Sequence, residues 1–251
     1  MDQQAAHDNV LRSRLAEVEE LRARALSEAI GKSNISVNDA AVIIARKCRA
    51  GRPHRIVAGV CGFPASGKTT MAKWVVGQLN EHYGPGYAAH LPMDGFHYRN
   101  SRLERDGLDG IKGDISTYDV NGLVEKLSEV RRHGHSTILA PDYVREMHEV
   151  RESAIEIPAS TRAVVVEGIY IGYTDKGGAW SKVRTLLDVL FYLNIGADVC
   201  VERIIARNRA VGRGEEMIKR KLWNDFYFMK RAINVLREAD YIVYPSAGED
   251  H

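Results

Sequence analysis

A glycine-rich segment between a strand-like run and a helix-like run constrains this chain most. Residues 62–69 match G-x-x-x-x-G-K-[ST], the pattern of a phosphate-binding P-loop. The apolar run 56–61 predicts a buried strand before it, and residues 70–79 predict the helix that follows. Glycines let backbone N–H groups turn inward, and the new helix presents its positive end to an anion. The segment therefore predicts a nucleotide phosphate site.

Two side chains of this loop have expected roles. Lys68 should reach the β- and γ-phosphates, and the Thr69 hydroxyl should bind Mg²⁺. A glycine-rich turn that binds nothing is the alternative, and the flanking strand and helix disfavour it. The residues expected to contact the nucleotide are Gly62, Phe63, Pro64, Ala65, Ser66, Gly67, Lys68, Thr69 and Thr70.

Composition restricts the class of protein. The 251 residues, 45% hydrophobic and 27% charged, are typical of a soluble globular chain with one sizeable α/β domain. Because 35 Lys+Arg nearly balance 33 Asp+Glu, a nucleic-acid partner is not expected. The sequence has neither a membrane-spanning run nor an N-terminal signal peptide, and its three cysteines form no C-x-x-C pair. We expect a cytoplasmic protein with reduced thiols.

The first fifty residues predict two helices. Apolar residues from Leu11 to Leu26 recur at helical spacing, Gly31 would end this helix, and Ser36 could cap a second one. The first helix is either a dimerisation arm or packs on the core. We slightly favour packing on the core, and a homodimer remains open.

Beyond the P-loop, predicted strands and helices alternate. Strands are expected at 87–91, 163–166, 186–195 and 241–244, and helices at 120–132, 199–209 and 215–236. This alternation predicts a mostly parallel sheet with helices on both faces.

Carboxylates follow two of these strands, where ligands bind in parallel sheets. Asp94 is the candidate base that orients the phosphoryl acceptor and takes its proton, although Asp94-Gly95 could be only a turn. Glu167 is the candidate carboxylate for Mg²⁺, directly or through water, and it could also contact the acceptor. Its alternative role is an acidic residue stabilised by a helix dipole.

Arginines concentrate at residues 203–214 and suggest a lid. Arg203 and Arg207 share one helical face, and Arg209 and Arg213 approach a glycine-flanked turn. We expect Arg203 and Arg207 to contact the nucleotide, and Arg209 and Arg213 to act on the transferring phosphoryl group. A solvated basic helix is the alternative.

Three histidines have less certain roles. His133 and His135 could bind a metal, but a surface loop after a helix is the favoured interpretation. His97 follows Asp94 closely, so it could bind the acceptor or pack within the loop.

Taken in order, these motifs resemble the uridine kinase, phosphoribulokinase and type I pantothenate kinase superfamily, especially its bacterial nucleoside- and sugar-kinase-like members. The resemblance implies a P-loop NTPase fold with a five-stranded parallel core, ATP and Mg²⁺, a catalytic Asp94 and an arginine-bearing lid. It divides the chain into an N-terminal helical extension, 1–52, and a P-loop kinase domain, 53–251. The matching segments are 62–69, 91–97, 112–113, 117–119 and 165–168.

One segment departs from the uridine kinase pattern. Those relatives carry Pro-x-Tyr-Asp toward the acceptor, whereas Pro141-Asp142-Tyr143 has the tyrosine and aspartate in the other order. The acceptor is therefore left open among a nucleoside, a sugar and a pantothenate-like alcohol.

The sequence thus favours an ATP-dependent kinase that phosphorylates a hydroxyl of a small polar metabolite. A regulatory switch that binds nucleotide without phosphotransfer is the alternative, but it needs no Asp94. A GTPase is disfavoured, since Asn194 is followed by Ile195-Gly196 and not by a guanine-reading motif. Besides Glu167, the expected acceptor residues are Asp94, His97, Tyr98, Arg102, Tyr143 and Arg145.

Overall fold

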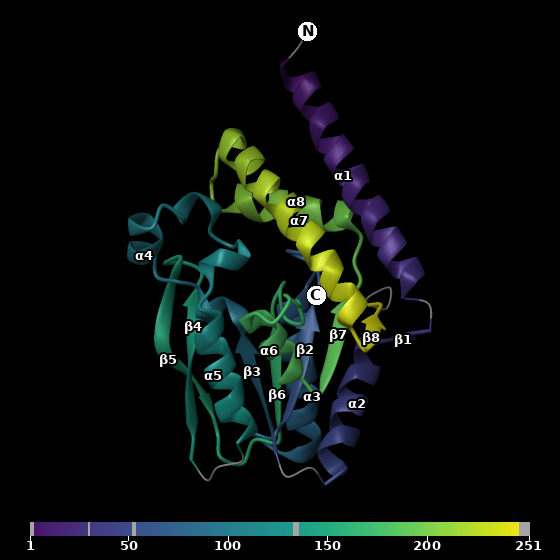
Figure 1. Cartoon of the computed structure of the whole chain (residues 1–251), viewed down its shortest axis with the longest axis vertical. Coiled ribbons are helices and arrows are strands. Elements are labelled where there is room, and N and C mark those ends of the chain that lie inside the picture. The colour runs from purple at the N-terminus through teal and green to yellow at the C-terminus, as the bar shows by residue number, and fades with distance from the viewer. Residues whose placement is uncertain (1–2, 30, 52–53, 133–135, 246–251) are drawn as a thin grey trace.

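The computed structural model describes residues 3–29, 31–51, 54–132 and 136–245 (Figure 1). His133 and His135, interpreted above as part of a surface loop, lie outside the described residues. No helix in the described part of the chain combines the length and apolar character needed to cross a membrane.

The main sheet has six described strands, all parallel. The expected five-stranded core is present, and β1 adds a sixth strand beside β8. β1 is only Ser-Asn-Ile, which is too short to show an alternating pattern, so the sequence did not predict it. The strand order is β1 (Ser33–Ile35), β8 (Tyr241–Val243), β7 (Val189–Leu193), β2 (Ile56–Cys61), β6 (Ala163–Glu167) and β3 (Ala88–Pro92).

Helices cover both faces of the sheet, as the sequence predicts. Every residue of β2 is buried, because its side chains alternate between two apolar cores. One core contains α2 (Val37–Arg49) and α3 (Lys68–Tyr83). The other core contains residues of α5 (Val120–Arg131), α6 (Ala179–Thr185), α7 (Ala197–Ala210) and α8 (Glu215–Glu238).

The N-terminal helix α1 (Gln3–Glu28) lies along α8 and also contacts α7 (Figure 1). Val18 and Ala25 of α1 are fully buried in the larger core, so this helix packs on its own chain. α2 begins after Ser36, whose hydroxyl accepts a hydrogen bond from the N–H of Asp39 in a capping box, as the sequence predicts.

An antiparallel hairpin that the sequence did not predict lies outside the main sheet. It consists of β4 (Ile138–Val144) and β5 (Glu149–Ile157), which pair only with each other. The exposed residues of β5 do not alternate regularly with buried ones, which weakens the strand signal. Its backbone packs on the turn after β3, where a Cβ on Gly95 would approach the Pro141 carbonyl oxygen to 2.4 Å.

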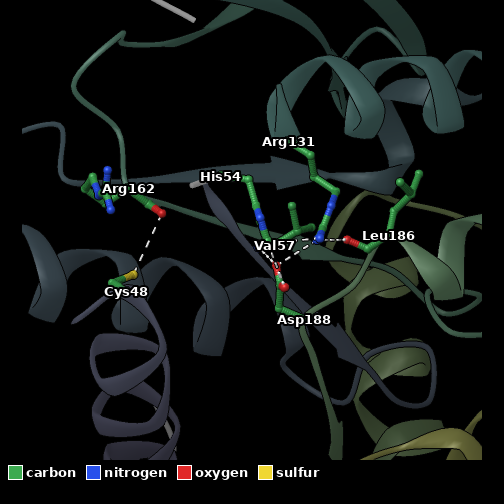
Figure 2. Close-up of polar contacts among 7 residues, drawn as sticks. All are labelled: Cys48, His54, Val57, Arg131, Arg162, Leu186 and Asp188. Atoms are coloured by element: carbon green, nitrogen blue, oxygen red, sulfur yellow. Dashed lines mark hydrogen bonds and ion pairs between the residues drawn. The ribbon is translucent and has the colours of Figure 1, made fainter. Parts of the chain in front are cut away.

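A buried carboxylate fastens the amino-terminal end of the sheet (Figure 2). One oxygen of Asp188 accepts from the Val57 N–H at 2.9 Å and from Arg131 at 2.8 Å, and the other lies 3.1 Å from His54 Nε2. Burial by itself raises the pKa of Asp188, but the Val57 N–H, His54 and Arg131 outweigh it and hold the pKa below its ordinary value. Asp188 therefore links β2, β7 and α5.

The three cysteines are free and buried, as expected for reduced structural thiols. The Cys48 thiol lies 3.8 Å from the Arg162 carbonyl oxygen (Figure 2). Burial raises the pKa of Cys200 to about 12 and also raises the pKa of Cys61, so neither is a reactive thiolate near neutral pH.

Candidate active site

The loop between β2 and α3 has the backbone of an anion-binding turn. Gly62, Ala65 and Gly67 all have positive φ, at 150°, 58° and 95°. A Cβ on Gly62 would lie 2.7 Å from the Leu193 carbonyl oxygen, so only glycine fits beside β7. The buried Ser66 hydroxyl has no hydrogen-bond partner among the described atoms. An unpartnered buried hydroxyl beside the start of α3 suits a phosphate oxygen.

Lys68 begins α3 and is folded back over the loop. Its Nζ donates to the Phe63 carbonyl oxygen at 2.7 Å, and the side chain is buried. Burial lowers the pKa of Lys68, while the nearby carboxylates of Glu167 and Asp94 oppose that shift. The ammonium group is thus held in a dry site close to both candidate carboxylates.

Glu167, at the end of β6, faces the P-loop. Its Oε1 accepts from the Thr69 hydroxyl at 2.8 Å, and His90 Nε2 lies 3.6 Å from the same oxygen. Burial by itself raises the pKa of Glu167, but His90, Lys68 and Thr69 outweigh it, so the net pKa is lowered. A threonine hydroxyl beside an ionised carboxylate provides the hard oxygen ligands that Mg²⁺ prefers.

No group of three or more His, Cys, Asp or Glu side chains within the described residues could hold a metal ion. Mg²⁺ bound between Thr69 and Glu167 would therefore need water and nucleotide phosphate oxygens to complete its shell.

Asp94 lies in a short 3₁₀ turn (Met93–Phe96) directly after β3. The Tyr118 hydroxyl donates to its Oδ1 at 3.4 Å, and Arg145 Nη2 of the hairpin lies 3.7 Å from Oδ2. Burial raises the pKa of Tyr118 well above its ordinary value, so the phenol remains a donor. The carboxylate is 35% exposed and can therefore be reached by a ligand in the cavity.

His97 supports this turn. One ring nitrogen, Nδ1, lies 2.9 Å from the Asp94 carbonyl oxygen, and the ring packs against Tyr118 and Tyr143. Burial lowers the pKa of His97, and the Asp94 charge only partly opposes it. The neutral ring packs within the loop and also lines the cavity. Both expected roles of His97, packing in the loop and binding the acceptor, are therefore compatible with its position.

One cavity of about 1100 Å³ brings most of the predicted residues together. It is lined by residues 64–70 of the P-loop, by Asp94 and Glu167, and by His97, Tyr143 and Arg145 on the other side. Arg203 and Arg207 of α7 also line it, as does Arg213. The P-loop and the turn that carries Asp94 therefore open into one continuous cavity.

Five of the predicted residues do not line this cavity. Gly62 and Phe63 begin the P-loop, and the Phe63 side chain is buried in the core, where it packs against Tyr192. Tyr98 and Arg102 line a neighbouring cavity of about 830 Å³, where the Arg102 guanidinium lies 3.5 Å from the Tyr98 ring centroid. Arg209 is on the exposed side of α7 and pairs with Glu215 at 3.0 Å. Arg209 follows Arg207 by two residues, so it faces away from the side of α7 that Arg203 and Arg207 share. Arg102 lies in a short helix and Tyr98 just before it, where residue type alone does not fix the side-chain direction.

The lid and the hairpin are joined by one arginine. Arg213 Nη1 donates to Asn208 Oδ1 at 2.7 Å, and Nη2 lies 2.9 Å from His148 Nε2 at the hairpin tip. Burial, together with the nearby cations Arg213, Lys221 and Lys112, lowers the pKa of His148. A neutral ring can accept the hydrogen bond from Arg213.

The cavity also contains ionisable residues to which we assigned no role from the sequence. Lys112 donates to the His148 carbonyl oxygen at 2.8 Å, and Lys221 and Asp225 project from α8. Burial raises the pKa of Asp225 to about 6, although Arg207 and Lys221 oppose it. Lys112 and Tyr118 lie in family-like segments and could have been found. His148, Lys221 and Asp225 carry no local signal.

Comparison with known proteins agrees with this geometry. Residues 57–231 match the model of the phosphoribulokinase / uridine kinase family. The uncharacterized protein YggC of Escherichia coli K12 is 32% identical over 184 residues, which are 73% of this chain and 72% of that protein. A pantothenate kinase from Limosilactobacillus reuteri is 30% identical over 113 residues, 45% of this chain and 36% of the relative.

A solved structure has the same architecture. The crystal structure of a "putative fructose transport system kinase" from Silicibacter sp. TM1040 superposes with a TM-score of 0.69 and 25% identity. The match covers 80% of this chain and 98% of that one. Because the family model spans more than half of the sequence, this chain belongs to the phosphoribulokinase / uridine kinase family.

Proposed function

We propose that this protein is an ATP-dependent kinase that transfers the γ-phosphate to a hydroxyl of a small polar metabolite. The observation that supports this most is that Lys68 and the Thr69–Glu167 pair share one cavity with Asp94. Lys68, Thr69 and Glu167 suit a nucleotide phosphate chain with its metal, and Asp94 lies where an acceptor can reach it. A nucleotide switch without phosphotransfer has no use for such a carboxylate.

In this proposal the P-loop amides and Lys68 hold the phosphates, while Thr69 and Glu167 hold Mg²⁺. The metal, when bound, neutralises phosphate charge and helps to align the transferring group. Lys68 follows the charge that develops on the phosphoryl oxygens. Its buried position strengthens that interaction, since water screens it less.

Asp94 acts on the acceptor. It accepts a hydrogen bond from the acceptor hydroxyl and orients its oxygen toward the phosphorus. It receives the proton as the new O–P bond forms and the bond from the γ-phosphorus to the bridging oxygen breaks, which releases ADP. Tyr118 and Arg145 limit the positions that the carboxylate can take. Arg203, Arg207 and Arg213 complete the site from the lid side and exclude water. We leave Arg209, Tyr98 and Arg102 out of the proposed site because of their placement.

The charges on the acceptor side favour an acceptor with an anionic group. Eight Lys and Arg side chains line the cavity against four carboxylates, and Lys112, Arg145, Arg213 and Lys221 are among the eight. Burial lowers the pKa of Lys112, opposed by the Glu149 carboxylate, and Lys221 adds to the lowering. A bound carboxylate or phosphate would relieve the repulsion among these cations.

A screen of alcohols for ADP release from ATP and Mg²⁺ tests the proposal. Its arms are neutral nucleosides, neutral sugars, pantothenate, hydroxy acids and sugar phosphates. We expect an anionic acceptor to give the highest kcat/KM and Asp94→Asn to abolish that turnover. If the protein bound ATP but turned over none of these acceptors, a nucleotide-binding switch without phosphotransfer would be favoured instead. A faster neutral nucleoside would contradict the anionic class.

A further inference from the structure

The N-terminal helix α1 contacts more than the outside of α8. Midway along it, Glu19 and Arg22 form an ion pair at 2.7 Å, with side chains 28% and 18% exposed. Arg22 Nη1 donates to the Asn194 side-chain oxygen at 2.7 Å, and Glu19 Oε1 accepts from the Ala197 N–H. Both contacts are made at the junction where β7 ends and α7 begins.

Glu19 supplies a cap that α7 lacks. The residue at the N-cap of α7 is Gly196, which has no side chain and makes no capping bond of its own. A carboxylate at this position satisfies one free N–H of the first turn and interacts favourably with the helix dipole. An element more than 170 positions earlier in the chain therefore helps to fix the start of α7.

The same junction touches the P-loop. A Cβ on Gly62 would meet the Leu193 carbonyl oxygen, and one on Gly67 would lie 4.0 Å from Leu193 Cδ2 and from Arg203 Nη1. Arg203 is two turns into α7, so its position depends on how that helix starts. Any shift at the β7–α7 junction therefore reaches both the phosphate loop and an arginine of the lid.

We infer that α1 is a positioning element of the nucleotide site, acting through the Glu19–Arg22 pair on the β7–α7 junction. Glu19 and Arg22 are positioning residues, since neither lines the cavity. This inference rests on the proposed nucleotide site, and it gives the helical extension a role in ATP affinity.

Calorimetric titration of the full chain with ATP and Mg²⁺ tests it. Glu19→Ala and Arg22→Ala should each weaken ATP affinity about tenfold, within the range of coupling energies transmitted through packed elements. The double variant should lose little more, because the two residues act as one unit. Glu19→Gln keeps an oxygen acceptor for Ala197 and should recover part of the affinity.

The matched control is Glu17→Ala. Glu17 lies on the same helix and pairs with Lys230 of α8 at 2.5 Å, away from the junction. The Glu17→Ala variant should leave ATP affinity unchanged. Its effect on the melting temperature measures how much stability is lost when α1 is loosened away from the junction. If Glu19→Ala does not fold, Arg22→Ala and Glu19→Gln carry the test.

The outcomes are distinct. Unchanged ATP affinity in Glu19→Ala and Arg22→Ala would overturn the inference, as would equal losses in Glu17→Ala. Failure of the parent protein to bind ATP would instead remove the nucleotide site, and the proposed function with it.

Discussion

At the scale of single residues, Asp94 separates an enzyme from a nucleotide-binding switch. Asp94→Asn keeps the size and can accept the Tyr118 hydrogen bond, but it cannot take a proton. ATP affinity should stay near that of the parent, because Lys68 and Thr69 are unchanged. Phosphoryl transfer should fall by about 10²- to 10⁴-fold, the range for general-base catalysis. Calorimetry and an ADP-release assay measure the two quantities.

Two results would contradict this role. Loss of ATP binding would mean that Asp94 serves the metal or the fold. Full transfer would mean that the base is elsewhere, with Glu167 as the next candidate.

Lys68 should act on the transferring phosphoryl group and not on the acceptor. Lys68→Ala removes a buried ammonium group near the transferring phosphoryl, so turnover should fall by about 10²-fold or more. The measurement is kcat with saturating ATP. Turnover close to that of the parent would argue against the proposed mechanism.

At the scale of elements, Arg213 connects the arginine-rich segment 203–214 to the tip of the hairpin. Arg213→Ala removes both the Asn208 and the His148 contacts, so kcat should fall about tenfold or more while the melting temperature without ligand stays the same. Arg209→Ala is the matched control on the same segment, since Arg209 pairs with Glu215 at the surface. If both variants kept the kcat of the parent, this segment would be only a solvated basic surface.

Elements with a regular pattern could be predicted from the sequence. The apolar run of β2 and the glycines after it located the P-loop, and Ser36 as a capping residue marked the start of α2. Strand ends placed Asp94 and Glu167 at one cavity. The hairpin and β1 were missed because one alternates irregularly and the other has only three residues. His148, Lys221 and Asp225 join the cavity through tertiary packing, which no local pattern encodes.

At the scale of the whole molecule, Asp188 should make stability depend on pH. Its pKa in the folded protein is below the ordinary value, so its stabilisation is complete above about pH 4 and is lost as pH falls through the folded pKa. The parent should lose melting temperature on acidification below about pH 4. Asp188→Asn should melt lower at neutral pH and show a weaker acid dependence in that range.

Asp106→Asn is the control for this experiment. Asp106 pairs at the surface with Arg105 and Arg102, which also lower its pKa, but both partners are close neighbours in the sequence. Solvent screens such a pair, so this variant should melt close to the parent at neutral pH. An acid dependence of Asp188→Asn equal to that of the parent would assign the effect to other carboxylates.

The β4–β5 hairpin has a consequence for the history of such proteins. Among the described strands, its two strands pair with each other and with none of the main sheet, yet Arg145 and His148 at its tip line the cavity. Mutations that lengthen or shorten this tip, or change its side chains, should leave the strand order and the P-loop intact. If the acceptor binds beside this tip, as proposed above, natural selection can change acceptor preference there while the P-loop is kept.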